Sequence, residues 1–233
     1  MKILALETAT DPGSVALWLD GRVVARDCPR EQSNSAALLP LAGATLKMEG
    51  LGFSDLDGIA FGMGPGSFTG LRVSCGVAQG LALARDLPLL GVGTLDAMAL
   101  AAGGERVKKV IVTLDARMGE VYYGLFIDGV PRGEIGVCPP ERIPVPLFES
   151  SNASGWLACG NGLSAYPVLR ERLAGAVTQW KPDILPHAEF VVRLAAPRLE
   201  RGERIDPADA APLYVRDKVA KTVAERLAEG GRA

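Results

Sequence analysis

The chain has 233 residues, of which 48% are hydrophobic, and its 25 basic and 27 acidic residues give a formal net charge of −2. This composition can bury a sizeable core, either as one large domain or as two small lobes. It excludes the global positive field that would concentrate nucleic acid or an anionic membrane around the protein, so any role on RNA needs a basic partner.

Export, membrane insertion and disulfide bonding are not indicated by the sequence. Glu7 interrupts the apolar start, and the longest uncharged helical run, residues 73–84, is shorter than the roughly 20 residues needed to span a bilayer. The four cysteines are far apart and lack the CxxC spacing of a zinc site. We therefore expect reduced thiols and a cytoplasmic protein.

The first hundred residues alternate between strand and helix patterns. "KILALET", "GSVALWLDG" and "RVVARD" predict three consecutive strands, and Asp20-Gly21 predicts a two-residue type I′ hairpin between the last two. Apolar spacing then predicts a helix over 35–48, with Asn34 or Ser35 as its cap. The remaining predictions are a strand at 58–61, a helix over 69–84, a strand at 88–92 and a helix over 94–102. The order is βββαβαβα.

The pattern restarts after the charged segment "GGERVKK". A shift of 108 residues places "ILALETATDPGSVALWLDG" on "IVTLDARMGEVYYGLFIDG", so that Glu7 aligns with Asp115 and Asp20-Gly21 aligns with Asp128-Gly129. Agreement of a strand, an acid, a second strand and a turn at one offset indicates an internal duplication. We expect two related lobes, each beginning with a β-hairpin.

Four motifs run in order through nearly the whole chain. They are "ILALETAT" with "SVAL", "GPGSFTGLR" leading into "AQGLALA", "LDARMGEVYYG", and "PLYVRDKVA". Together they resemble the TsaB (YeaZ-like) family of bacterial tRNA threonylcarbamoyladenosine biosynthesis proteins, which are non-catalytic relatives of TsaD in the actin-like ATPase superfamily.

The resemblance implies an α/β, two-lobed actin-like (ASKHA, ribonuclease H-like) fold with a duplicated βββαβαβα pattern. It places an N-terminal lobe at 1–102, a reduced C-terminal lobe at 107–212 and a tail or helix at 213–233. It also implies a scaffold that dimerises with a TsaD-like transferase, works with a TsaE-like ATPase and meets tRNA through the complex. Self-association of the isolated chain stays open.

The alternative is an autonomous actin-like kinase or ATPase, or a peptidase. The glycine loop lacks the lysine of GxxxxGK[ST] and also fails GxGxxG. The stretch "REQSNSAALLP" has no histidine where the catalytic relative has a metal-binding pair, and we interpret the single histidine, His187, as an ordinary loop or surface residue. We expect no catalytic residue, no metal and no cofactor bound by this chain alone, with ATP or ADP only at a partner interface.

The glycine loop is interpreted as a sharp structural turn that needs positive φ angles and close backbone approach. Its residues are Gly62, Gly64, Pro65, Gly66, Ser67 and Gly70.

Glu7 and Asp115 are predicted as vestigial cleft acids. Acids at these strand ends hold magnesium in kinases of the superfamily, but here we favour acceptance of hydrogen bonds from the backbone or from hydroxyls such as Thr8, Thr10 or Ser14. Arg117 and Glu120 match the family motif and have no chemistry that the sequence assigns.

The helix over 69–84 is apolar on two sides, so one side is predicted to need a cover from outside its own sheet. Gly76 and Gly80 would let a neighbouring helix approach closely. With the helix over 35–48, this predicts a partner interface made of Leu38, Leu39, Ala42, Leu46, Val73, Gly76, Val77, Gly80 and Leu81.

Overall fold

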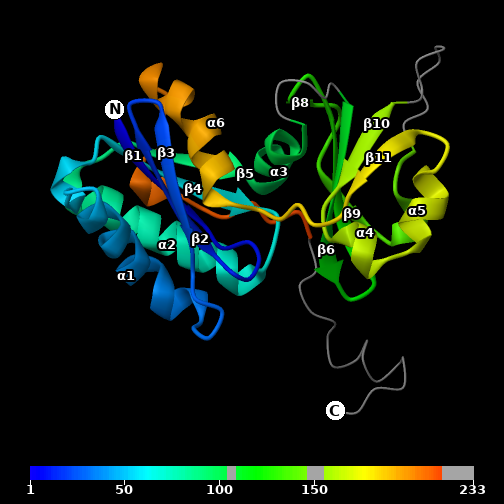
Figure 1. Ribbon diagram of the computed structural model, residues 1–233, viewed down its shortest axis with the longest axis horizontal. Coiled ribbons are helices and arrows are strands. Elements are labelled where there is room, and N and C mark those ends of the chain that lie inside the picture. Colours follow the sequence, from blue (N-terminus) through cyan, green and yellow to red (C-terminus); the bar gives the residue numbers. More distant parts are fainter. Residues whose placement is uncertain (104–108, 146–154, 217–233) are drawn as a thin grey trace.

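The computed structural model describes residues 1–103, 109–145 and 155–216, and shows two lobes side by side, each built on its own sheet (Figure 1). The first lobe contains β1 (Lys2–Glu7), β2 (Ser14–Leu19), β3 (Arg22–Asp27), α1 (Asn34–Met48), η1 (Phe53–Asp55), β4 (Gly58–Gly64), α2 (Phe68–Arg85), β5 (Leu89–Gly93) and α3 (Thr94–Gly103). This is the βββαβαβα order expected from the sequence.

The second lobe has a less regular order. It contains β6 (Lys109–Arg117), β7 (Glu120–Ile127), β8 (Val130–Pro131), β9 (Gly136–Cys138), η2 (Pro140–Arg142), β10 (Trp156–Cys159), α4 (Gly162–Ala165), α5 (Val168–Leu173) and β11 (Val177–Lys181), and is followed by α6 (Ala188–Glu200) and η3 (Pro207–Asp209). In the described part of this lobe, a 3₁₀ turn stands between the hairpin strands and β10, where the first lobe has the long helix α1.

The two sheets share one plan. The first has the order β3-β2-β1-β4-β5, and the second has the order β11-β10-β6-β7-β8, with β9 also paired to β7. In each, an antiparallel hairpin is extended by parallel strands, as β1 pairs with β4 and β6 pairs with β10. The two-lobed, actin-like α/β architecture is thus confirmed.

Both predicted Asp-Gly turns are confirmed by the backbone. Asp20 and Gly21 have φ values of 49° and 100°, and Asp128 and Gly129 have 52° and 74°, which is the pair of positive angles that a type I′ hairpin requires. The duplication is less exact at the other end of the hairpin. β1 ends at Glu7, whereas β6 continues past Asp115 through an irregularity to Arg117.

The last helix of each lobe crosses to the other lobe, so the expected boundaries at 1–102 and 107–212 do not match the packing. Met98 and neighbouring α3 side chains pack with Val112 of the second sheet. Val191 and other apolar residues of α6 pack with Ile3 of the first sheet. Each sheet has an apolar face that a helix must cover, and on one face of each sheet that helix comes from the other half of the chain.

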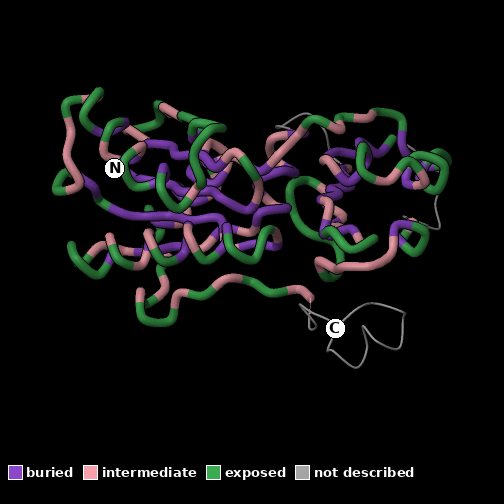
Figure 2. The backbone as a smooth tube through the Cα atoms, turned by 90° about the horizontal axis from the view of Figure 1, so that it is seen from below, coloured by how far each residue is buried: buried purple, intermediate pink, exposed green. Residues whose placement is uncertain are grey.

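After α6 the chain stays on the first lobe as far as Tyr214. The expected tail or helix over 213–233 lies outside the described residues from 217 onward. Figure 2 shows buried strands through the middle of both lobes, with exposed residues along the outer helices and the C-terminal segment. None of the helices in the described ranges is long and apolar enough to cross a membrane.

The glycine loop makes room for neighbouring groups at each of its four glycines. A Cβ on Gly70 would lie 1.9 Å from the backbone oxygen of Thr8, and one on Gly66 would lie 2.5 Å from the Cβ of Ala9. Ser67 accepts a hydrogen bond from the Gly70 N–H at 3.2 Å and so caps α2. The expected close approach between strand and helix is present.

The other two glycines accommodate more distant parts of the chain. A Cβ on Gly62 would lie 2.0 Å from Oε2 of Glu7, and one on Gly64 would lie 2.8 Å from the backbone oxygen of Leu213. Of the four, only Gly64 has a positive φ, at 116°, and Pro65 follows it in a cis peptide. The requirement at the other three positions is space rather than backbone angle.

This difference between glycines can be tested on stability. Gly70→Ala forces a methyl group onto a backbone carbonyl, so we expect a loss of about 2–4 kcal/mol in the free energy of unfolding. Gly80→Ala is the matched control, because a Cβ there meets nothing within 4 Å. Alanine in this exposed helical position should add about 1 kcal/mol. Urea unfolding measures both changes, and equal effects would contradict the packing argument.

Candidate functional site: the interlobe cleft and the α1–α2 face

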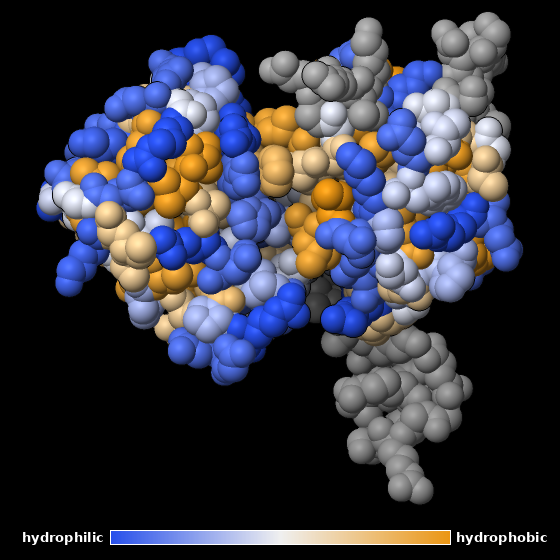
Figure 3. Space-filling model, viewed as in Figure 1, coloured by the Kyte–Doolittle hydropathy of each residue, from blue (hydrophilic) through white to orange (hydrophobic). Residues whose placement is uncertain are grey.

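A cleft of about 440 Å³ lies between the lobes. Figure 3 shows this hollow with hydrophilic side chains on both sides of its lower rim. Its walls come from the loop after β1, the start of α2, the end of β6 and the C-terminal segment, and include Thr10, Ser67, Phe68, Asp115, Arg117, Asn161, Tyr214 and Arg216. This is where both predicted acids were expected to face one another.

Glu7 does not line the cleft, which corrects half of that prediction. It is 1% exposed, and the glycine loop closes over it. Its Oε1 accepts a hydrogen bond of 2.6 Å from the Ala9 N–H, while Oε2 is buried without a hydrogen-bond partner among the described residues. Burial raises the pKa of Glu7 to about 7, against the opposing effect of the hydrogen bond from the Ala9 N–H.

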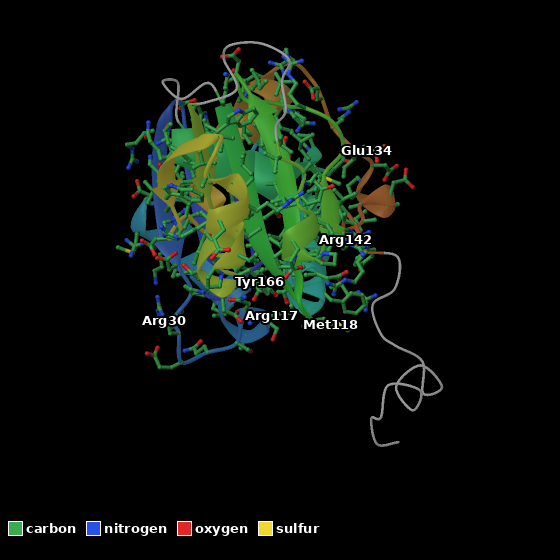
Figure 4. All side chains as sticks on the ribbon, turned by 90° about the vertical axis from the view of Figure 1, so that its right-hand side faces the viewer. Arg30, Arg117, Met118, Glu134, Arg142 and Tyr166 are labelled. Atoms are coloured by element: carbon green, nitrogen blue, oxygen red, sulfur yellow. The ribbon has the colours of Figure 1, made fainter. Side chains whose placement is uncertain are left out.

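Asp115 does line the cleft, but its oxygens are already engaged. Oδ1 accepts hydrogen bonds from the Arg117 N–H at 2.8 Å and from the Tyr166 hydroxyl at 2.9 Å. Oδ2 lies 3.2 Å from Nη1 of Arg117. Figure 4 shows Arg117, Met118 and Tyr166 at the same end of the second lobe. A backbone donor holds Glu7, and a backbone donor and a hydroxyl donor hold Asp115.

The specific hydroxyl donors expected for these acids were wrong. Thr8 donates instead to the Gly70 carbonyl at 2.7 Å, and Ser14 accepts from the Ala188 N–H at 2.9 Å. Tyr166, the hydroxyl donor to Asp115, was missed, because it follows a short helix that only the tertiary fold brings to the strand end. Among the described residues, no group of three histidine, cysteine, aspartate or glutamate side chains could hold a metal ion.

His187 has a structural role at the start of α6. Its Nδ1 accepts a hydrogen bond from the Glu189 N–H at 3.2 Å and caps the helix, while Nε2 lies 3.1 Å from Oδ1 of Asp27. Both ring nitrogens are therefore occupied. Sequence reasoning placed His187 in a loop or at the surface but missed the helix cap.

The predicted partner interface divides into a buried set and a surface set. Leu38, Ala42 and Leu46 are at most 1% exposed and belong to the core of the first lobe, so their assignment to an interface is corrected. They form the inner side of α1, which covers the first sheet. Val73, Val77 and Leu81 are partly buried against that same core.

The exposed part of this region forms a surface that we call the α1–α2 face. It combines the exposed Leu39, at 45%, and Leu83, at 59%, with Gly76 and Gly80, beside which there is open space. Leu83 was missed, although its place three residues after Gly80 on the same helix was a usable signal. The two glycines leave bare backbone at the surface of the described part of the chain, where nothing lies within 4 Å of a Cβ placed on either.

Comparison with known proteins first relates this chain to a class, that of TsaD-like and YeaZ-like proteins. Residues 28–130 match the family model of TsaD, tRNA N6-adenosine threonylcarbamoyltransferase. The structure also resembles YeaZ from Pseudomonas aeruginosa, with a TM-score of 0.80 and 36% identity over 91% of this chain and 99% of that one. A second P. aeruginosa structure, described as similar to peptidase YEAZ, gives a TM-score of 0.82.

The sequence comparison is more specific. The chain is 38% identical to the tRNA threonylcarbamoyladenosine biosynthesis protein TsaB of Escherichia coli K12, over 94% of this chain and 96% of the relative. It is 34% identical to TsaB of Haemophilus influenzae, over 94% and 95%. The chain therefore belongs to the TsaB family, and the resemblance inferred from the four motifs is confirmed.

The buried Glu7 predicts a pH dependence of stability. Its folded pKa of about 7 lies above the ordinary value of 4.5, so the folded state holds a proton that the unfolded chain has released. The contribution of Glu7 is complete below about pH 4.5, declines as the pH rises and levels off above about pH 7. The whole decline is roughly 3 kcal/mol.

Glu7→Gln removes the titrating group and keeps the shape. The difference in free energy of unfolding, wild type minus variant, should fall between pH 4.5 and 7 when urea titrations are compared. Parallel curves across this range would show that Glu7 does not bind a proton in the folded state.

Proposed function

We propose that the chain is a non-catalytic scaffold subunit in the synthesis of N6-threonylcarbamoyladenosine in tRNA, and that it binds a TsaD-like transferase through the α1–α2 face. Membership of the TsaB family supports the pathway. The observation that supports the partner role is the surface itself. The helix pair is apolar at the exposed Leu39 and Leu83. Its backbone is bare at Gly76 and Gly80, so a helix of a partner can approach closely.

The cleft supports a non-catalytic role. Kinases of this superfamily use acids at these strand ends to hold magnesium, whereas here Glu7 is sealed under the glycine loop and Asp115 is bonded to Arg117 and Tyr166. We infer that the isolated chain binds no nucleotide, and that ATP or ADP would be held only together with the partner. Isothermal titration with Mg-ATP tests this, and micromolar binding by the chain alone would contradict it.

A peptidase is the second candidate, because Ser14, Asp27 and His187 lie in one region of the first lobe. The geometry opposes a catalytic triad. Ser14 is 1% exposed and its oxygen accepts from a backbone N–H, while both nitrogens of His187 are used by the helix cap and by Asp27. The histidine has no free nitrogen to activate the serine.

The first test of the proposal is reconstitution. The chain alone should transfer no threonylcarbamoyl group to tRNA, since it has a net charge of −2 and its cleft acids are engaged. Activity should appear when a TsaD-like transferase, a TsaE-like ATPase, tRNA and threonylcarbamoyl adenylate are supplied, since the adenylate donates the group and AMP leaves. Transfer by the chain without these partners would overturn the scaffold assignment.

The second test addresses the acids in the reconstituted system. Glu7→Gln and Asp115→Asn should keep the rate of tRNA modification within about threefold of wild type, because neither carboxylate contacts substrate in this proposal. Circular dichroism confirms that the variants are folded. A loss above about 100-fold would assign roughly 2.7 kcal/mol of transition-state stabilisation to the cleft and identify an active site there.

The third test maps the interface. Gly80→Arg and Leu39→Glu place a charge in the α1–α2 face, and a charge buried without a partner costs several kcal/mol. We expect the dissociation constant for the transferase to rise at least about 30-fold, which corresponds to about 2 kcal/mol. Any self-association of the isolated chain should be lost as well.

Val130→Glu is the matched control, because Val130 is 55% exposed on the second lobe, away from this face. It should change the affinity less than twofold. Size-exclusion chromatography with light scattering and a binding titration provide the readouts. Wild-type affinity in the folded Gly80→Arg and Leu39→Glu variants would place the interface elsewhere.

A further inference from the structure

The segment 205–216 joins three of the four sequence motifs at one place. Figure 2 shows it as a separate length of chain that runs along the first lobe toward the second. It begins against the edge of the first sheet, where the Ile205 N–H donates to the Leu89 carbonyl at 2.8 Å. The side chain of Gln79, on α2, then donates to the Pro207 carbonyl at 2.6 Å.

The next anchor lies at the glycine loop and the start of α2. The Leu213 N–H donates to the Met63 carbonyl at 2.6 Å, and the absence of a side chain at Gly64 leaves room for the Leu213 oxygen. Arg72 donates through Nε to the Tyr214 hydroxyl at 3.0 Å, and its guanidinium lies 3.7 Å from the centre of the Phe68 ring. Thus α2 holds the segment at several points.

The chain then crosses to the second lobe within one residue. Val215 packs against the core of that lobe. Arg216 donates to the Ala116 carbonyl at 3.0 Å and to Oε2 of Glu120 at 2.5 Å, with a side chain that is only 15% exposed. A charge-assisted bond of this kind is among the stronger polar contacts. It gives Glu120, which the sequence left without a role, a defined partner.

The segment is held by separate anchors and not by a ladder of sheet hydrogen bonds, and none of its residues is fully buried. Leu213 and Tyr214 are 37% and 44% exposed, and the described part of the segment forms only one isolated bridge to the sheet. Segments with few buried contacts open at a lower free energy than the core of a domain. Its release would leave both sheets intact.

We propose that residues 205–216 are a releasable latch that joins the α1–α2 face to the second lobe and transmits occupation of that face to the lobe. Arg72 lies one helical turn before Gly76, so a partner seated on the face borders the residue that holds Tyr214. Arg216 anchors the other end of the segment to the second lobe. The transmission part of this proposal rests on the proposed function, whereas the latch itself is a property of the isolated chain.

Amide hydrogen exchange in the isolated chain tests the latch. Arg216→Ala should accelerate exchange at both Ile205 and Leu213 at least tenfold, because the segment opens as one unit. Glu120→Ala changes no residue of the segment and should accelerate the same two amides to a smaller extent, since the bond to the Ala116 carbonyl remains.

Arg193→Ala is the matched control, since it breaks an exposed Arg193–Glu189 pair on α6 that does not touch the segment. It should leave both amides unchanged. The Ile59 amide, which donates to the Pro88 carbonyl within the first lobe, reports on the lobe itself and should not change in any variant. Acceleration at Leu213 alone, or at none of the segment amides, would overturn the latch.

The transferase partner tests transmission. Its binding to the wild-type chain should slow exchange at Leu213 at least threefold, and Arg216→Ala should abolish that effect while the partner still binds. Absence of binding would refute the proposed function and leave the latch result standing. Binding without any change at Leu213 would refute transmission and leave the docking proposal intact.

Discussion

The contact between Gly70 and the carbonyl of Thr8 is the constraint on which much of this structure depends. It brings the start of α2 directly onto the end of β1, at a distance that no larger residue permits. The oxygen of Thr8 has no room beside a Cβ, and the Thr8 hydroxyl reaches back to the Gly70 carbonyl at 2.7 Å. A strand and a helix are thereby fixed backbone to backbone.

The character of the cleft follows from this contact. Because α2 and its loop close over the end of β1, Glu7 is buried. Burial raises the pKa of its carboxyl group to about 7, and the group does not reach a cation in the cleft. The duplicated position behaves differently, since β6 runs on to Arg117 and leaves Asp115 at the cleft wall. The two acids at matching strand ends therefore differ in exposure, since Glu7 is buried and Asp115 lines the cleft.

The same placement of α2 determines which of its sides is buried and which is exposed. Its inner side, with Leu71, Cys75 and Ala78, is buried, so Gly76 and Gly80 must face outward at helical spacing. The C-terminal segment lies against Gly64, at the end of β4, and against Arg72, near the start of α2. The exchange of α3 and α6 between lobes adds a second connection, so that the two sheets are tied together by helices as well as by the chain itself.

The sequence by itself determined the family, the βββαβαβα order of the first lobe, both Asp-Gly hairpins and the need for close approach at the glycine loop. Each depends on neighbours in the chain: strand alternation, helical spacing, turn residues and absent side chains. Only the tertiary structure decided that Leu38 is core while Leu39 is surface, that Glu7 is sealed, and that Arg216 meets Glu120 across 96 positions. Those outcomes depend on which surfaces meet in space, and a local pattern carries no information about the group that will arrive opposite it.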